Sequence, residues 1–284
     1  MLRQCGYNNR QGVLKIMNLQ NFYEKLDEIF QQRDAQKVVE FLEQSLGEAK
    51  EQDDALGIIA VSNELGGVYR VLGKTEQAKQ VCEDVLKRIK AVGMGDTQHY
   101  ATALLNAGDV RLSAGEWEAA LDLFIQAKER LTALELGEDY RMAALCNNMS
   151  VAYRETGKLQ EAENVLETAL SVISGLPGCA IELATTYVNL GELQVKQEKL
   201  DAAKESLGQA VRLFEESQKT KDPHYASALT GLGEVLSAEG ELESAKSHYT
   251  KALGLIEQSY GKDSPAYQVI SRNLAKIEEA EKEG

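Results

Sequence analysis

Proline is scarce in this chain, and its scarcity indicates the class of fold. The 284 residues contain only Pro177, Pro223 and Pro265. A proline inside a helix removes a backbone hydrogen bond and costs about 3 kcal/mol. Long stretches without proline therefore suit helices, and the sequence predicts an almost wholly helical protein.

Cysteine and histidine are also rare, which argues against several kinds of chemistry. The four cysteines show no CxxC spacing and are expected to be thiols in a reducing cytoplasm, with Cys82 and Cys146 buried. Among only three histidines, His99 and His224 occupy the same repeat position, which favours a structural role. No nucleophile, base or metal-ligand spacing stands out. The sequence therefore predicts no enzyme, no catalytic residue, no metal and no cofactor.

Positive charge is in deficit. Lysine and arginine number 31 against 45 acidic residues, a formal net charge of −14. Nucleic acids and anionic membranes attract basic surfaces, so both are argued against as partners. The negative charge has two interpretations, solubility or an acidic binding surface. No apolar run is long enough to span a bilayer and no secretory signal is recognisable, so a cytoplasmic location is expected.

What the chain does contain is a repeated pair of helices. Residues 141–173 hold two runs of apolar residues at three- and four-residue steps, separated by Thr156-Gly157-Lys158. This pattern predicts two amphipathic helices joined by a tight turn. Equivalent turn residues recur at intervals of 41 or 42 residues: Gly73, Gly115, Gly157, Glu198 and Gly240. Glu198 is expected to keep its hairpin despite a left-handed backbone that costs about 1 kcal/mol.

Small residues recur with the same period at packing positions. The first helix of each pair carries Gly66, Gly108, Ser150, Gly191 and Gly233. The second carries Ala78, Ala120, Ala162, Ala203 and Ala245, and, seven residues further on, Val85, Ala127, Ala169, Ala210 and Ala252. One hairpin cannot bury its apolar faces alone, so the pairs are predicted to stack on one another.

These residues carry a family resemblance. Small residues at repeat positions 8, 20 and 27, apolar residues at 7 and 24, and glycine at 15 resemble the tetratricopeptide repeat, whose usual period is 34. The longer step is similar to the variant of kinesin light chains and many bacterial proteins. The resemblance covers about residues 19–284 and implies an all-α fold, a right-handed α-α superhelix of stacked hairpins. It implies little about function, because this scaffold serves many partners.

The repeat pattern also predicts how the chain is organised. We expect a disordered or weakly ordered tail at 1–18, a degenerate capping repeat at 19–54, five repeats at 55–262 and a C-terminal capping helix at 263–284. Met17 precedes the first helical pattern, so translation is hypothesised to begin there, which leaves open whether residues 1–16 belong to the native protein. Intact-mass measurement of the native protein would answer this.

Asparagines recur on the helix face that the resemblance assigns to a concave ligand groove. Groove position 6 holds Glu64, Asn106, Asn148, Asn189, Gly231 and Asn273, and position 5 adds Asn63 and Asn147. Asparagine is a mediocre helix former, so its recurrence needs a reason. An amide can donate to and accept from the backbone of an extended peptide, as groove asparagines of related proteins do. Alternatively, these amides hydrogen-bond to adjacent helices and follow the repeat consensus.

Charged residues at neighbouring groove positions suggest the kind of ligand. The groove contains Asp109, Arg154, Glu192 and Glu234 and is mixed to acidic. The Lys and Arg cluster that grips a terminal carboxylate in chaperone-tail domains is not reproduced. A neutral or basic protein or peptide segment is therefore the expected partner, with Asn106, Asn148 and Asn189 contacting its backbone.

The leading hypothesis is a non-enzymatic scaffold or adaptor that holds an extended segment in the groove. The alternative is a signalling-peptide receptor or regulator, similar to bacterial sensors built from this repeat, which would act through a separate partner. A structural module that pairs chains through exposed terminal helices is a third possibility.

Overall fold

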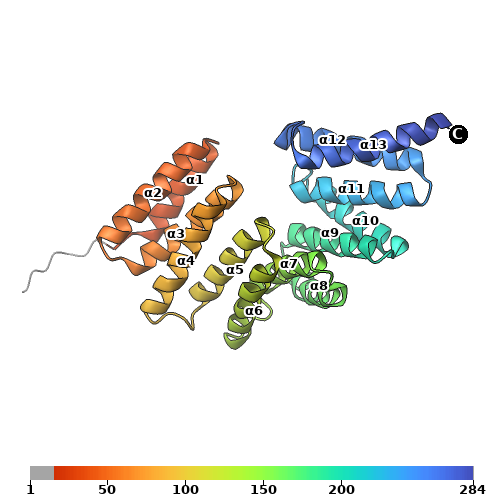
Figure 1. The fold of residues 1–284 in the computed structure, drawn as a ribbon. Helices are drawn as coiled ribbons and strands as arrows, with labels where there is room; N and C mark the ends of the chain where they lie inside the picture. Colours follow the sequence, from red (N-terminus) through yellow and green to blue (C-terminus); the bar gives the residue numbers. More distant parts are fainter. Residues whose placement is uncertain (1–15, 284) are drawn as a thin grey trace, which may run out of the picture. The chain divides into compact units, whose positions relative to one another are not determined.

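The computed structural model describes residues 16–283. These residues form thirteen α-helices and no strand, which confirms the all-α prediction. Clustering of contacts divides the chain into two compact units, one ending at Arg130 and the other beginning at Leu131. The helices follow one another along the chain in both units (Figure 1).

Unit 1 contains the first helices of the chain. They are α1 (Leu19–Gln31), α2 (Ala35–Glu51), α3 (Ala55–Val71), α4 (Thr75–Ala91), α5 (Gln98–Ser113) and α6 (Trp117–Ala133), the last of which runs a few residues past the boundary. Each helix from α1 to α5 packs on its neighbour in sequence, and α3 also contacts α5. The first helices of successive pairs therefore lie beside each other. Leu26, Leu42 and Leu65 are among the buried side chains that form the core of this unit.

Unit 2 repeats the arrangement. Its helices are α7 (Tyr140–Glu155), α8 (Leu159–Ser174), α9 (Ala180–Lys196), α10 (Leu200–Glu216), α11 (Pro223–Ala238), α12 (Leu242–Tyr260) and α13 (Pro265–Glu283). Contacts join α7 to α9, α9 to α11 and α11 to α13, so the first helices of the pairs form one layer. Helices α8, α10 and α12 each pack on their hairpin partner. Ser150, Ala162 and Ala169 are buried, as their recurrence predicts.

Every junction between consecutive helices contains one residue with a left-handed backbone. Seven of these residues are glycines and five are not. The non-glycine residues are Arg33, Asp53, Glu135, Glu198 and Gln218. Glu198 has φ +60° at the turn between α9 and α10, and the two helices pack closely, so the predicted hairpin forms without glycine.

Short polar side chains begin many of the helices. The Asp54 carboxylate accepts from the Gly57 backbone N–H at 3.1 Å, and Asp222 accepts from that of His224 at 2.9 Å. Asp222 precedes Pro223, whose missing N–H is harmless in the first turn. Ser264 begins α13 in a similar way, because its hydroxyl accepts from the Tyr267 N–H. Helices α11 and α13 thus both begin at a proline.

The recurring small residues allow large side chains to approach the first helix of a pair. A Cβ atom on Gly108 would lie 2.3 Å from the ring of Phe124, and one on Gly233 would lie 2.7 Å from the ring of Tyr249. Neither distance is possible for real atoms, so these helix pairs pack at a spacing that only glycine permits.

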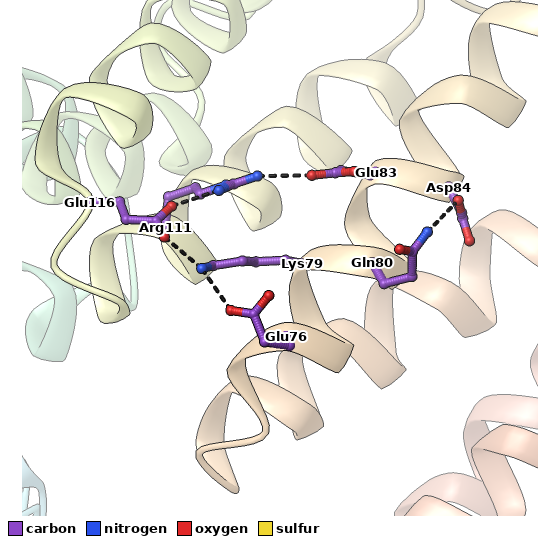
Figure 2. A network of polar contacts seen from close by, with 7 residues as sticks. All are labelled: Glu76, Lys79, Gln80, Glu83, Asp84, Arg111 and Glu116. Atoms are coloured by element: carbon purple, nitrogen blue, oxygen red, sulfur yellow. Dashed lines mark hydrogen bonds and ion pairs between the residues drawn. The ribbon is translucent and has the colours of Figure 1, made fainter.

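Charged side chains join one helical pair to the next. Figure 2 shows the network between α4 and the α5–α6 hairpin. Lys79 lies 2.5 Å from a carboxylate oxygen of Glu116, whose other oxygen lies 2.6 Å from Arg111. Arg111 also reaches Glu83 on α4 at 2.8 Å. The network therefore fixes the second helix of one pair against the first helix and turn of the next.

Part of the predicted tail lies outside the described residues, namely residues 1–15. The remainder contacts unit 1: Asn18 caps α1, and the Met17 N–H donates to the Asp54 carboxylate at 2.8 Å. Within residues 16–283, no helix combines the length and apolar character that a membrane crossing needs.

Candidate functional site

The first helices of unit 1 surround a cavity of about 580 Å³. Its volume lies in the range of ordinary ligand pockets. We call it the unit 1 groove, and it is lined by Leu19, Tyr23, Leu56, Ile59, Ala60, Asn63, Glu64, Gly67, Arg70, His99, Thr102, Asn106 and Asp109. All of these residues come from α1, α3 and α5. The repeat period places them there, because one face of each first helix is turned to the same side.

Two of the predicted asparagines meet in this groove. The Asn106 side-chain nitrogen donates to the Asn63 side-chain oxygen at 3.2 Å, which joins α5 to α3. Both side chains are half-buried. A primary amide has two donor hydrogens and an oxygen with two acceptor sites, and this bond uses one donor and one acceptor site. The pair therefore keeps hydrogen-bonding capacity at the surface of a cavity.

Glu64 is a carboxylate of this groove whose pKa is raised. Burial raises its pKa above the ordinary value, and the negative charge of Asp27 on α1 raises it further. Tyr23 also lines the groove, and burial together with Glu64 raises the pKa of its phenol. A carboxylate held in a partly dry site beside another acid is destabilised by its surroundings, and a cation there would relieve this.

A second asparagine pair occurs in unit 2 at equivalent repeat positions. The Asn189 side-chain nitrogen donates to the Asn147 oxygen at 3.0 Å, and the Asn147 nitrogen donates to the Thr186 hydroxyl at 2.9 Å. Asn147 is only 6% exposed and Asn189 only 8%. These amides join α7 to α9, as the alternative interpretation of the sequence anticipates, and they present little surface to a ligand.

Two further predicted residues form an ion pair in unit 2. The Arg154 guanidinium on α7 lies against the Glu192 carboxylate on α9. The Lys196 ammonium donates to the Arg154 backbone carbonyl at 2.9 Å. The charge of Glu192 is thus largely matched within the protein, which reduces its attraction for an external cation.

The first helices at the end of unit 2 surround a second cavity of about 430 Å³. We call it the unit 2 groove, and it is lined by Glu192, Ala226, Ser227, Thr230, Gly231, Glu234, Ile256, Pro265, Ala266, Val269 and Ile270. Glu234 is exposed, yet the surrounding protein desolvates its carboxylate and, together with Glu192, raises its pKa. Asn273 on α13 donates to Glu234 at the long distance of 3.5 Å.

The predicted site residues thus fall into separate groups. Asn63, Asn106 and Asp109 line the unit 1 groove, and Glu192 and Glu234 line the unit 2 groove. Asn147 and Asn189 are buried between α7 and α9, and Arg154 is paired with Glu192. Asn148 is half-buried on α7, and Asn273 touches Glu234 from the final helix.

Tyr23, Glu64 and His99 are groove residues that the sequence analysis did not select. Glu64 stands at groove position 6, so its repeat position is a signal by which it can be found. His99 shares its repeat position with His224, which favours a structural role and gives no signal of a groove position. Tyr23 belongs to the degenerate first pair, and only the tertiary structure brings it into one cavity with residues of α3 and α5.

Among the described residues, potential metal ligands do not cluster and the Cys82 thiol is unreactive. Residues 16–283 contain no cluster of three or more His, Cys, Asp or Glu side chains arranged to hold a metal ion. Cys82 and Cys146 are buried, as predicted, and burial raises the pKa of the Cys82 thiol to about 11. A thiol with that pKa stays protonated at neutral pH and is a poor nucleophile.

Comparison with protein families matches residues 57–133 and 140–216 to the tetratricopeptide repeat, and residues 188–265 to a second description of the same repeat. Among curated proteins, no sequence matches the chain. Several solved structures share the fold. BtubC (BKLC) from P. vanneervenii is 18% identical, with a TM-score of 0.65 over 80% of this chain and 92% of that one.

The apo form of the quorum sensor NprR from B. thuringiensis is 17% identical, with a TM-score of 0.67 over 93% of this chain and 70% of that one. NprR in complex with its cognate peptide NprX is also 17% identical, with a TM-score of 0.63 over 92% of this chain and 79% of that one. At these identities the likeness concerns the fold alone.

Proposed function

The chain belongs to the tetratricopeptide repeat family, and from this premise we propose that it is a non-enzymatic scaffold that binds an extended protein or peptide segment on the faces of its first helices. The observation that carries the proposal is the unit 1 groove. It combines a ligand-sized cavity, apolar floor residues and half-buried amides from two successive pairs. Such a site suits a backbone with alternating polar groups.

In this proposal some of the asparagines contact the ligand and others hold neighbouring helices together. Asn63 and Asn106 line a cavity and contact ligand backbone there, whereas Asn147 and Asn189 are buried and hold α7 against α9. Asn148 is only half-buried and remains a proposed contact in unit 2. The proposed backbone contacts are therefore concentrated in unit 1.

The charges of the grooves favour a neutral or basic segment. Glu64 and Asp109 line the unit 1 groove, and Glu234 has an exposed carboxylate in the unit 2 groove. The raised pKa values of Glu64 and Glu234 mean that each carboxylate gains from a nearby cation. A lysine or arginine of the ligand supplies that cation, and Glu192 adds less because Arg154 already contacts it.

An array of ten-residue peptides that are basic, neutral or acidic tests the proposal directly. We expect basic and neutral peptides to be retained, with affinity that falls as salt screens the charges. Asn63→Ala combined with Asn106→Ala should weaken the binding of retained peptides roughly thirtyfold, since two lost hydrogen bonds of about 1 kcal/mol each amount to about 2 kcal/mol. Asn164→Ala is the matched control, because Asn164 is exposed on α8 and lines neither groove.

Helicity measured by circular dichroism must stay unchanged in all variants for the comparison to hold. Equal affinity of the wild type and the Asn63/Asn106 double variant would remove the proposed mechanism. Retention of acidic peptides in preference to basic ones would contradict the proposed ligand charge.

A second candidate is a peptide receptor whose shape responds to its ligand. The solved NprR–NprX complex shows that a protein with this fold can hold a peptide, and the likeness extends over 92% of this chain. Small-angle scattering with and without a retained peptide separates the two candidates. A receptor changes its radius of gyration on binding, whereas a static scaffold does not.

A further inference from the structure

A separate apolar groove of about 430 Å³ lies at the turn ends of the first two helical pairs. We call it the turn groove. It is lined by Phe30, Arg33, Asp34, Ala35, Val38, Glu64, Gly67, Val68, Arg70, Val71 and Leu72. It shares Glu64, Gly67 and Arg70 with the unit 1 groove, whereas Phe30, Arg33 and Val71 belong to it alone.

Large apolar side chains are exposed in this groove. Phe30 is 45% exposed, Val71 75% and Leu72 39%. Single exposed apolar residues are common, but three at one cavity form a patch, and such patches in soluble proteins mark interaction sites. Val38 and Val68 add an apolar floor beneath them.

Two arginines lie in the same groove without an internal partner. Within residues 16–283, neither the Arg33 nor the Arg70 guanidinium forms an ion pair with a carboxylate. The other arginines that the structure describes in unit 1 form ion pairs: Arg88 with Asp53, Arg111 with Glu116 and Arg130 with Asp96. Of the two acids of the groove, Asp34 accepts from two backbone N–H groups of α2, and Glu64 is half-buried with a raised pKa caused by desolvation and Asp27.

We propose that the turn groove binds a peptide segment that presents an apolar side chain next to one or two carboxylates. The apolar side chain fills the space among Phe30, Val71 and Leu72, and Arg33 and Arg70 pair with the carboxylates. This ligand is acidic, whereas the ligand assigned to the unit 1 groove is neutral or basic. The turn groove is therefore a second docking site, which adjoins the unit 1 groove at Glu64, Gly67 and Arg70.

The charge of the groove argues against one occupant from within the chain. Residues 1–15 contain Arg3, Arg10 and Lys15 and no acidic residue, so the two groove arginines repel that segment. The acidic C-terminal residues of a second copy do fit the charge, and the test below distinguishes that case.

The probe is a set of three fluorescent twelve-residue peptides with a central Leu-Phe-Leu, flanked on both sides by glutamate, glutamine or lysine. With the Asn63→Ala/Asn106→Ala variant, whose unit 1 groove is weakened, anisotropy should show tightest binding for the glutamate peptide, weaker binding for the glutamine peptide and the weakest for the lysine peptide. Raising the salt concentration should weaken the binding of the glutamate peptide more than that of the other two peptides. Arg33→Gly and Arg70→Gln should each reduce its affinity roughly tenfold, and Val71→Ser should reduce it by a smaller factor.

Arg33→Gly is well suited to this purpose because Arg33 has φ +53° at a turn, where glycine is the favoured residue. The variant removes the guanidinium without straining the fold, and its melting temperature should not fall. Arg212→Gln is the matched control, since Arg212 is exposed on α10 and far along the chain from this groove. Asn63→Ala with Asn106→Ala, which tests the unit 1 groove, should leave glutamate-peptide binding intact.

Equal binding of the three peptides, or affinity unchanged by Arg33→Gly, would overturn the proposal. Sedimentation at several protein concentrations supplies the remaining test. Self-association that Arg33→Gly abolishes would assign the groove to a second copy of the chain and would also overturn binding of an external partner. A loss of basic-peptide binding in Asn106→Ala with glutamate-peptide binding retained would separate the two sites.

Discussion

Gly108 shows how a single residue sets the spacing of two helices. The ring of Phe124 on α6 occupies the space where a side chain at residue 108 would begin. Phe124 is fully buried, so the ring has little freedom to move away. The same relation recurs between Gly191 and Leu207, and between Gly233 and Tyr249. At these positions, the close packing of the two helices therefore requires a residue that has no Cβ atom.

We therefore expect Gly108→Ala to lower the free energy of unfolding by about 1–2 kcal/mol. Overpacking against Phe124 costs about 1–3 kcal/mol, and the better helix propensity of alanine offsets up to about 1 kcal/mol. Gly47→Ala in α2 is the control, because a Cβ there meets no atom within 4 Å. That variant should be more stable than the wild type by up to about 1 kcal/mol. Urea unfolding measures both, and equal effects would contradict the packing argument.

At the scale of helices, ion pairs at one repeated place join successive pairs. Lys79 on α4 contacts Glu116 in the next turn, and Lys204 on α10 contacts Glu241 in the same way. Between α8 and the α9–α10 turn the charges are reversed, with Glu163 contacting Lys199. The reversal shows that stacking requires opposite charges at these two repeat positions, whichever position carries the positive charge. Opposite charges at such places favour the correct neighbour over others.

The ion pairs of Glu116 make the stability of the fold depend on pH. Hydrogen bonds from Arg111 and Lys79 hold the pKa of its carboxyl below the ordinary value of 4.5 (Figure 2). As pH falls, the unfolded chain therefore takes up this proton before the folded protein does. The stabilisation is complete above about pH 4.5 and is lost as pH falls through the lowered pKa.

Glu116→Gln should therefore be less stable than the wild type at pH 7, and the difference should close as the pH falls below 4.5. Chemical unfolding at a series of pH values measures this difference. Glu129→Gln serves as the control, because Glu129 is exposed on α6 and forms no ion pair within residues 16–283. A difference that is constant across this range would exclude the ion pairs as its source.

At the scale of the whole molecule, each unit has a groove with a carboxylate that its surroundings destabilise. Glu64 in unit 1 and Glu234 in unit 2 both have raised pKa values, because burial penalises their charge and a second acid repels it. Such groups reduce stability at neutral pH, and proteins commonly keep them where binding needs them. In both grooves the carboxylate is therefore expected to lower the stability of the fold and to attract a cationic ligand.

Glu64→Gln tests this trade in unit 1. We expect the variant to be more stable than the wild type at pH 7 and to bind basic peptides more weakly. The folded state holds the Glu64 proton more tightly than the unfolded chain, so wild-type stability rises as pH falls through the raised pKa. The stability gain of the variant should accordingly vanish below about pH 4.5. Unfolding curves and peptide anisotropy measure the two effects, and a less stable variant with unchanged affinity would exclude the proposed role.

The helices, their pairing and their turns follow from the amino-acid sequence without reference to the tertiary structure. The cause is local, because a turn residue such as Gly157, a cap such as Asp222 or a small residue such as Ala162 acts within one repeat or on its nearest helix. Glu198 fits the same rule, since its neighbours along the chain were enough to predict a turn without glycine.

Which groove residues a ligand can reach depends on the packing of whole helices and could not be predicted from the repeat pattern. Asn106 and Asn189 stand at the same repeat position, yet Asn106 lines a cavity and Asn189 is buried against Asn147. The pKa of Glu64 likewise depends on Asp27, which α1 brings from another helical pair. Burial and electrostatic interaction depend on side chains distant in sequence, so repeat position alone could not predict either one.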